Sequence, residues 1–341
     1  MKIYIISFTK KGTELAETIS NKLEKTMCFS MKIARDGITM VSSLSEWTQM
    51  AFEQADGIVF VGACGIAVRA IAPYLKDKYQ DPAVVVLDEK GEFVISLLSG
   101  HMGQANTLAQ KIADVIQATP VITTATDVND VFAVDTWIKQ NGFICLHEEQ
   151  SKNIIKQISA TLLEGKTVGF DSIFYHDKLP KGLIPAKHGE IGISLSVYKH
   201  NKLFQNTLYL IAPVLHMGIG CKKDTPVQQI EQAVFDVLEE ENIVMEAIKA
   251  VATIDLKQNE KGILSFCEQY QKQIHIFSSE QLSNVKGTIS HSDFVEQVTG
   301  VDNVCERAAL CSAENGSIIV NKRVKNGVTI SLAMENKLLS F

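Results

Sequence analysis

The chain has 341 residues, of which 46% are hydrophobic and 21% are charged, and this composition excludes a disordered, fibrous or collagen-like protein. The formal charge of -6 argues against a nucleic-acid-binding protein, because such domains present a basic face to phosphate groups. The seven cysteines include no C-x-x-C pair, so neither a zinc ribbon nor a disulfide framework is expected.

The first residues of the chain enter a predicted strand at once and lack the apolar core and cleavage site of a signal peptide. No apolar run approaches the roughly 20 residues that a membrane-spanning helix requires. The odd, unpatterned number of cysteines fits a reducing compartment. We therefore expect a cytoplasmic protein.

Strands and helices alternate through the first 130 residues. Short apolar and β-branched runs predict the strands, and apolar residues at helical spacing predict the helices. In chain order these elements fall at 3–7, 13–25, 44–55, 57–61, 66–74, 83–87, 93–97 and 105–116. The alternation predicts an α/β fold with an open, mostly parallel sheet that carries helices on both faces. A turn at 88–91 makes the strands on either side of it a predicted hairpin.

The remaining chain divides into two further predicted domains. The signals weaken over 131–212, which we interpret as a small linking α/β domain. A strand at 214–219 then opens a second α/β domain, followed by a helix with Thr225 as its cap and a proline in its first turn. The predicted domains are therefore 1–130, 131–212 and 213–341.

The chemically richest stretch runs from Leu97 to Asn106, between a predicted strand and a predicted helix. Strand ends that face helix starts are where α/β proteins place their sites. His101 is a candidate general base because imidazole changes charge near neutral pH; the alternative is a loop histidine that caps the helix. Asn106 is a candidate oxyanion donor, or a packing amide. An acyl-serine mechanism at Ser99 is disfavoured, since Leu97 replaces the first glycine of G-x-S-x-G.

Two further clusters follow predicted strands of the first domain. A glycine turn, Gly62 to Gly65, precedes a helix that carries Arg69, and such a turn offers amide donors to an anion. It is not a dinucleotide-binding motif, because G-x-G-x-x-G is absent. The second cluster is suited to a polar ligand or to turn and cap formation. Its members are Thr123, Thr124 and Asp127.

The last domain carries a predicted glycine turn at Gly218 and Gly220, followed by Lys222. The spacing is not that of a phosphate-binding loop, because Cys221 separates glycine from lysine, so anion contact and a solvated helix start remain the two readings. Asp255 and Lys257 would lie on one side of an extended segment, as ligand contacts or as a salt bridge. No two histidines have metal-ligand helical spacing, and no protein metal site is expected.

Together these residues resemble the cobalt-precorrin-5A hydrolase family, the lactone-opening enzymes of the anaerobic cobalamin pathway. Each motif alone is moderately specific, but their order and joint presence are highly specific. The motifs that carry the likeness lie at 62–73, 81–88, 97–106, 120–127, 218–223, 252–257, 299–301 and 328–333.

The resemblance implies a cobalt-containing tetrapyrrole substrate whose ring A acetate is closed as a δ-lactone. Water opens the lactone, the two-carbon fragment leaves as acetaldehyde, and the product is cobalt-precorrin-5B. Cobalt arrives in the substrate, so no protein cofactor is expected. The competing reading is a non-catalytic protein that binds or channels the corrinoid intermediate.

On this resemblance His101 is the expected base, with Ser99 and Asn106 orienting water or stabilising the oxyanion. An acidic protein needs focused cations to hold the acetate and propionate groups of the substrate. The expected partners are the tetrapyrrole, neighbouring cobalamin-pathway enzymes and a second copy of the chain in a homodimer, without nucleic acid or membrane. The expected substrate-binding residues are Gly62, Gly65, Arg69, Gly100, Thr123, Thr124, Asp127, Gly218, Gly220, Lys222, Asp255, Lys257 and Lys322.

Overall fold

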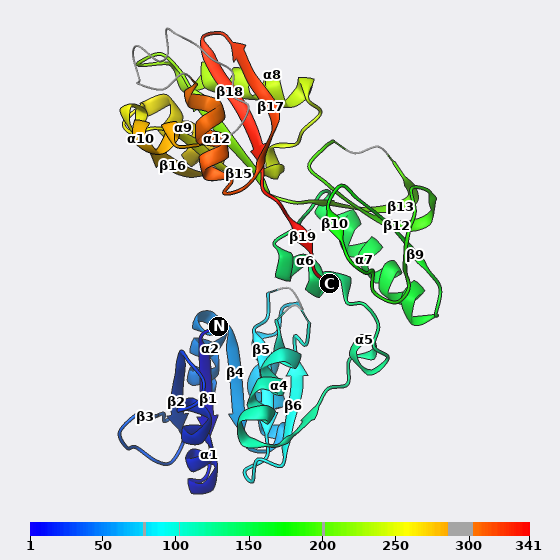
Figure 1. Cartoon of the computed structure of the whole chain (residues 1–341). Coiled ribbons are helices and arrows are strands. Elements are labelled where there is room, and N and C mark those ends of the chain that lie inside the picture. Colours follow the sequence, from blue (N-terminus) through cyan, green and yellow to red (C-terminus); the bar gives the residue numbers. More distant parts are fainter. Residues whose placement is uncertain (78–79, 102, 200–201, 286–302) are drawn as a thin grey trace. The chain divides into compact units, whose positions relative to one another are not determined.

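Two units make up the chain, Met1–Lys139 and Gln140–Phe341, in a computed structural model (Figure 1). The structure describes residues 1–77, 80–101, 103–199, 202–285 and 303–341. The first unit contains one sheet, and the second contains two larger sheets and a short strand pair. Within the described ranges, no helix is long and apolar enough to cross a membrane.

The first unit is built on a seven-stranded sheet of order β3-β2-β1-β4-β5-β6-β7. The strands up to β5 are parallel, β6 runs antiparallel to β5, and β7 runs parallel to β6. The reversal at β6 confirms the predicted hairpin. The strands are β1 (Ile3–Ser7), β2 (Thr26–Ser30), β3 (Ile38–Met40), β4 (Gly57–Val61), β5 (Ala83–Leu87), β6 (Phe93–Leu98) and β7 (Thr119–Val121).

Helices cover both faces of this sheet because alternate residues of its buried strands point to opposite sides. Ile5 packs with α1 and α4 in one core cluster, and Ile6 packs with α2 and α3 in another. This confirms the predicted fold class. The helices of the sheet are α1 (Lys10–Ser20), α2 (Leu44–Gln54), α3 (Cys64–Ile71), the 3-10 turn η1 (Ala72–Tyr74) and α4 (Ala105–Ile116), and the chain continues through α5 (Ala125–Val128) to α6 (Val134–Asn141), whose last two residues belong to the second unit.

The reversal of β6 decides which strand ends meet at each edge of the sheet. Leu98, at the carboxyl end of β6, pairs with Val84 near the amino end of β5. Since β7 runs with β6, its carboxyl end reaches the same edge. The segments after β6 and β7 therefore lie together, at the edge opposite the carboxyl ends of β1, β2, β4 and β5.

The second unit begins with a five-stranded sheet of order β11-β9-β12-β13-β8, packed against α7. Gly169 and Gly192 leave room for the buried Phe204 ring, which added Cβ atoms would approach to 2.3 and 2.5 Å. Near the C-terminus, β19 pairs with β10. The elements are β8 (Ile144–Cys145), α7 (Glu148–Leu163), β9 (Val168–Ser172), β10 (Tyr175–His176), β11 (Leu183–Pro185), β12 (Gly189–Ser196), β13 (Phe204–Ile211) and β19 (Leu338–Leu339).

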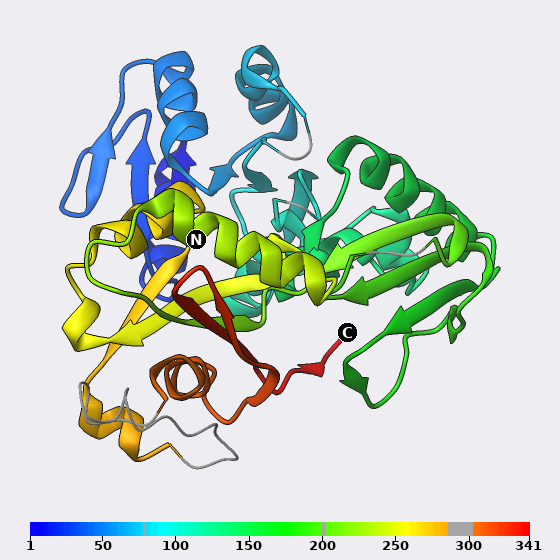
Figure 2. The ribbon, with the colours of Figure 1, turned by 90° about the horizontal axis from the view of Figure 1, so that it is seen from above.

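The other five-stranded sheet of this unit has the order β16-β15-β14-β18-β17 and confirms the predicted second α/β domain. Helix α12 packs on its central strands, and Figure 2 shows this helix end-on beside the β17–β18 hairpin. The elements are β14 (Leu215–Gly220), α8 (Val227–Glu240), η2 (Met245–Ala247), β15 (Ile248–Ile254), η3 (Asp255–Lys257), α9 (Lys261–Gln269), β16 (Gln273–Phe277), α10 (Ser279–Ser283), α12 (Val304–Ser312), β17 (Ser317–Lys325) and β18 (Val328–Met334).

Candidate functional site

The loop between β6 and α4 closes on itself through its backbone. Ser99 and Gln104 adopt left-handed conformations, with φ of 57° and 68°. The carbonyls of Ser99 and Gly100 then accept hydrogen bonds from Ala105 and Asn106 at 3.1 Å each. Because these carbonyls satisfy the first amides of α4, the helix begins without a side-chain cap. The alternative that the His101 side chain caps this helix is therefore wrong.

Two glycines let this loop pack tightly. A Cβ on Gly100 would lie 2.8 Å from Asn106 Oδ1, and one on Gly103 would lie 2.4 Å from Ser99 Cβ. The Ser99 hydroxyl is buried and has no hydrogen-bond partner within the described chain. Ser99 thus lies in the loop without contacting the His101 imidazole, and its helper role stays a prediction.

Asn106 joins three segments that are separate in the sequence. Its Oδ1 accepts a hydrogen bond from Ser96 at 2.6 Å, and its Nδ2 donates to Thr124 at 3.2 Å and to Asp127 at 3.0 Å. The side chain is buried, and both of its N–H groups are used. In this arrangement Asn106 orients Asp127, so an oxyanion would have to displace one of these bonds.

His101 has partners on both ring nitrogens. Nε2 lies 2.9 Å from Asp127 Oδ2 and 2.8 Å from Thr126 Oγ1, and Nδ1 lies 3.0 Å from Thr136 Oγ1. The His101 side chain is 16% exposed, and that of Asp127 is 36% exposed. The imidazole is therefore held against a carboxylate while it keeps limited access to solvent. We name the following group the His101 cluster: Ser96, His101, Asn106, Thr124, Thr126, Asp127 and Thr136.

The sequence reasoning missed part of this cluster. Ser96 faces Asn106 from β6, and Thr126 shares Nε2 of His101 with Asp127. Thr126 belongs to the quoted 120–127 motif, so its hydroxyl was a usable signal, whereas Thr136 meets His101 across 35 residues that no local pattern spans. Thr123 is exposed and its predicted contact with substrate stays a prediction.

The Gly62 turn and Arg69 lie at the opposite edge of the same sheet. The five residues of β4 separate the two edges by about 16 Å at roughly 3.3 Å per residue. The Gly62 amide donates to Leu87 O at 2.8 Å, and Arg69 Nη1 donates to Gly65 O at 2.8 Å. The Gly62 amide itself is therefore bonded inside the sheet region, and anion contact by the other amides of the Gly62 to Gly65 turn stays a prediction.

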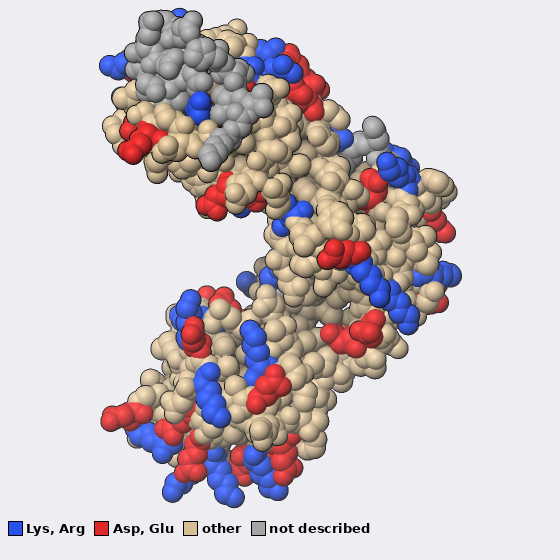
Figure 3. All heavy atoms as spheres, viewed as in Figure 1, with Lys and Arg blue, Asp and Glu red and all other residues tan. Residues whose placement is uncertain are grey.

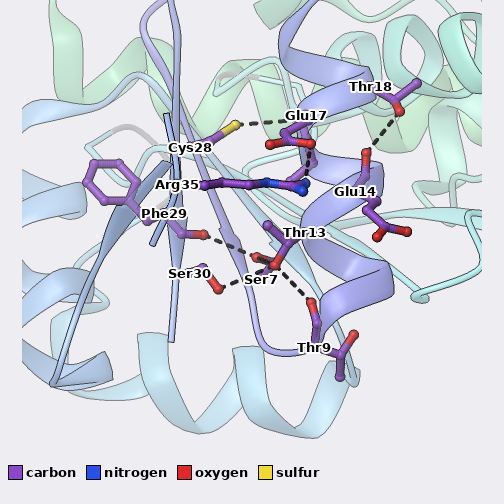
Figure 4. Close-up of polar contacts among 11 residues, drawn as sticks. Ser7, Thr9, Thr13, Glu14, Glu17, Thr18, Cys28, Phe29, Ser30 and Arg35 are labelled. Carbon is purple, nitrogen blue, oxygen red and sulfur yellow. Dashed lines mark hydrogen bonds and ion pairs between the residues drawn. The ribbon is translucent and has the colours of Figure 1, made fainter. Parts of the chain in front are cut away.

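Hydroxyls at this opposite edge bond to one another (Figure 4). Ser7 Oγ lies 2.9 Å from Thr13 Oγ1, which lies 3.3 Å from Ser30 Oγ and donates to Thr9 O at 2.8 Å. Ser7, Thr13 and Ser30 are fully buried. They tie the carboxyl ends of β1 and β2 to α1, which is a structural role.

In the second unit, the predicted glycine turn is part of strand β14. Gly218 pairs with Ser331 and Gly220 pairs with Thr329 of β18. A Cβ on Gly218 would lie 1.8 Å from Cys305 O, so glycine is required there by the close approach of α12. The prediction of a turn that offers free amides is therefore wrong.

The polar residues that follow β14 and β15 do meet at one edge, because these neighbouring strands are parallel. Lys222 is exposed, whereas Lys257 is 21% exposed and lies 3.3 Å from the buried carboxylate of Glu260. Asp255 opens the short helix that carries Lys257. Burial raises the pKa of the nearby Cys221 thiol, against the opposing influence of Lys257. This edge therefore carries the exposed Lys222 and also Lys257, whose positive charge is partly balanced by the Glu260 carboxylate.

Further observations bear on the predicted binding residues, on metal binding and on surface charge. Lys322 lies on β17, where its backbone amide donates to the buried Glu306 at 2.7 Å. The motif at 299–301 lies outside the described residues. Among the described residues, no three His, Cys, Asp or Glu side chains are grouped so that they could hold a metal ion. On the face that Figure 3 shows, basic and acidic side chains of the first unit are interspersed.

Comparisons with known proteins agree with the motif order. Residues 46–127 match the family model "Cobalamin synthesis G N-terminal", and 215–333 match "Cobalamin synthesis G C-terminus". The curated cobalt-precorrin-5A hydrolase of Priestia megaterium is 30% identical and is aligned over 97% of this chain and 94% of its own length. That of Salmonella typhimurium strain LT2 is 31% identical over 97% of both chains.

Solved structures include a homolog of cobalamin biosynthesis protein G from Sulfolobus solfataricus. It is 24% identical, covers 98% of this chain and 97% of its own, and has a TM-score of 0.43. The family assignment depends on the sequence relatives, whose identity extends through both units. The chain belongs to the cobalamin synthesis G family, the family of the cobalt-precorrin-5A hydrolases.

Proposed function

We propose that this protein is a cobalt-precorrin-5A hydrolase, which opens the ring A δ-lactone with water and releases acetaldehyde to give cobalt-precorrin-5B. The observation that carries the proposal is the His101–Asp127 pair, held at 2.9 Å inside a motif of this family. The near full-length similarity to two curated hydrolases supports the same reaction.

In the proposed mechanism the His101 imidazole takes a proton from water, and the water oxygen attacks the lactone carbonyl. Asp127 stabilises the imidazolium that forms, because its carboxylate already contacts the ring. The tetrahedral intermediate collapses with cleavage of the ester C–O bond, and the imidazolium returns its proton to the leaving oxygen. In this mechanism Ser99 and Asn106 act as positioning groups in the same loop and helix start.

The freed hydroxyl then allows loss of the two-carbon fragment. When a base removes its proton, the C–O bond becomes a carbonyl and the C–C bond to the macrocycle breaks. The electron pair of that bond stays with the macrocycle, and the fragment leaves as acetaldehyde. His101 is neutral again after the first step and is the candidate base for this one.

The substrate carboxylates need cations in a chain whose net charge is -6. Lys222 is the strongest candidate because it is exposed beside a strand end, and Lys257, Lys322 and Arg69 are further candidates. We assign the cobalt to the substrate and no cofactor to the protein. The cytoplasm is the proposed location, which the seven free cysteines support. Neighbouring pathway enzymes and a second copy of the chain are proposed partners.

Anaerobic incubation of the purified protein with cobalt-precorrin-5A, with trapping of acetaldehyde, tests the proposal. Stoichiometric aldehyde is expected. Spectral shifts of the bound corrinoid without aldehyde, from well-folded protein, would reject the hydrolase and favour the non-catalytic binding or channelling protein. Absence of both a spectral shift and aldehyde would reject both functions.

A further inference from the structure

The two ring nitrogens of His101 face chemically different partners. Nε2 faces the Asp127 carboxylate at 2.9 Å and the Thr126 hydroxyl at 2.8 Å. Nδ1 faces a single hydroxyl, that of Thr136, at 3.0 Å. A carboxylate only accepts hydrogen bonds, whereas a hydroxyl can donate or accept. The asymmetry determines where the imidazole proton lies.

The proton of the neutral imidazole belongs on Nε2, because only a donor there satisfies the Asp127 carboxylate. Thr126 then accepts from the same N–H, since Nε2 has no lone pair left. Nδ1 carries the lone pair and must accept, so the Thr136 hydroxyl donates to it. The basic atom of His101 is therefore Nδ1, and the group next to it is Thr136.

Thr136 is held in this place by its neighbours on α6. Val134, two residues before it, and Trp137, the residue after it, are buried, with 0% and 2% exposure, and they anchor the first turn of the helix. The Thr136 side chain itself is only half-buried, and its backbone amide is bonded to Asp135 Oδ1 at 2.9 Å. The Thr136 hydroxyl thus occupies the position next to Nδ1, at 3.0 Å, and a water that gives its proton to Nδ1 approaches through or beside this hydroxyl.

We propose that the Thr136 hydroxyl is a catalytic proton relay between water and His101, an inference that rests on the proposed lactone hydrolysis. The O–H bond of water breaks, its proton passes to Thr136 Oγ1, and the proton that Thr136 carried passes to His101 Nδ1. The hydroxide attacks the lactone carbonyl. The same protons return in reverse order to the alkoxide released by cleavage of the ester C–O bond, which leaves Thr136 and His101 as they began.

The test compares Thr136→Val, which keeps the shape but removes the hydroxyl, with Thr136→Ser, which keeps the hydroxyl. Relay predicts that Thr136→Val lowers kcat for acetaldehyde release by about 10²-fold or more at nearly unchanged KM. Thr136→Ser should restore at least about a tenth of the wild-type kcat. Near-normal kcat in Thr136→Val would overturn the proposal, as would equal losses in both variants.

Thr126→Val is the matched control, because it removes a hydroxyl from the same histidine at the other nitrogen. We expect it to lower kcat by less than about tenfold, since Asp127 still holds the proton on Nε2. An equal or larger loss in Thr126→Val than in Thr136→Val would show that the proton passes through Nε2 rather than through Nδ1. That result would overturn the relay.

A spectroscopic measurement separates failure of the relay from failure of the proposed reaction. In protein labelled with ¹⁵N-histidine, the His101 signals, assigned by their absence in His101→Gln, should show a proton on Nε2. Thr136→Val should move only the Nδ1 signal toward the value of an unbonded nitrogen. A proton on Nδ1 would overturn the relay even if the enzyme is active, and wild-type protein without aldehyde would reject the reaction alone.

Mass spectrometry of acid-quenched reactions distinguishes the relay from covalent catalysis by Thr136. Relay predicts no substrate adduct on Thr136 during turnover. An acyl ester on this residue would show that Thr136 is a nucleophile, which overturns the relay.

Discussion

Among the residues that the structure describes, two rows of carboxylate, histidine and hydroxyl are built in the same order. The His101 row consists of Asp127, His101 and Thr136, with contacts of 2.9 and 3.0 Å. The His216 row consists of Glu335, His216 and Ser312, with contacts of 2.7 and 2.6 Å. In both rows Nε2 faces the carboxylate and Nδ1 faces the hydroxyl. Contact geometry alone would assign them the same role.

Their surroundings differ. His101 lies in a loop with its side chain 16% exposed, whereas His216 lies within strand β14 and is 2% exposed. Ser312 ends α12 and also meets His275 Nδ1 at 2.7 Å, and Glu335 also binds Lys249. Burial lowers the pKa of His216, against the opposing effect of the hydrogen bond that it donates to Glu335. The His216 row joins strands and a helix and is closed to substrate, which makes it a structural network. The His101 row keeps access to solvent, which makes it the candidate site.

The largest expected effect comes from removing the exposed histidine. His101→Gln should lower kcat for acetaldehyde release by about 10³-fold, because the general base is lost while a polar side chain of similar size remains. Corrinoid binding should persist, as measured by spectral titration. The thermal unfolding midpoint should fall less than in the corresponding His216 variant, since His101 lies in a loop and is more exposed than His216.

The outcome that would contradict this assignment is a variant with near-normal turnover. A loss of binding in parallel with turnover would also count against it, since it would make His101 a binding residue. Asp127→Asn is the companion variant, because it keeps the hydrogen-bond geometry to Asn106 while it removes the charge that stabilises the imidazolium.

The second prediction concerns His216, whose removal should lower stability and leave the activity of the folded protein unchanged. His216→Ala should lower the free energy of unfolding of the second unit by about 2–4 kcal/mol, because it leaves a cavity and removes one hydrogen-bond partner each from buried Ser312 and from Glu335. Urea unfolding followed by circular dichroism measures the change. Protein that remains folded should keep wild-type kcat, and a lost kcat in stable protein would contradict a purely structural row.

The sequence predicted local elements well where hydrophobic periodicity is strong. The strand Ile3–Ser7 and the helix Ala105–Ile116 were predicted with the bounds that the structure shows, because each buries one face or two. The prediction that Thr225 caps α8 was wrong. Its hydroxyl donates to Lys222 O at 2.8 Å, and Pro226 takes the N-cap position.

The candidate site was predictable only in part, because its geometry depends on topology. The motif at 97–106 pointed to His101, but the antiparallel β6 places that loop at the edge away from Gly62. Glycine spacing also predicted a turn at Gly218, where the tight packing of α12 is the actual reason for glycine. Thr136 could not be found locally, since only the packed α6 brings it to the imidazole.

The third prediction concerns substrate affinity in the second unit. Lys222→Glu should raise KM by about tenfold with little change in kcat, because an exposed charge contributes through attraction rather than through chemistry. The effect should shrink at high salt. Lys223→Glu is the matched control next to it in the same segment, and an equal effect there would show that only net charge matters.

The smallest expected effect is a pH dependence of stability that separates the two histidine rows. Because burial lowers the pKa of His216, the unfolded chain binds a proton there more readily than the folded chain does. Stability should therefore fall as the pH drops through about 6.5, the ordinary pKa of histidine. The groups that face His216 are Glu335, His275 and Ser312, with Lys249 bound to the same carboxylate.

Glu335 contributes in the same direction but at lower pH. Burial by itself raises its pKa, yet the hydrogen bonds from Lys249 and His216 outweigh burial and lower it, so its stabilisation is lost progressively as the pH falls below 4.5. Thermal midpoints of wild type and His216→Gln between pH 8 and pH 5.5 isolate the histidine. The wild-type midpoint should fall more steeply than that of the variant. Parallel curves would mean that His216 takes up its proton in the folded chain as readily as in the unfolded one, and the contrast with His101 would then depend on exposure alone.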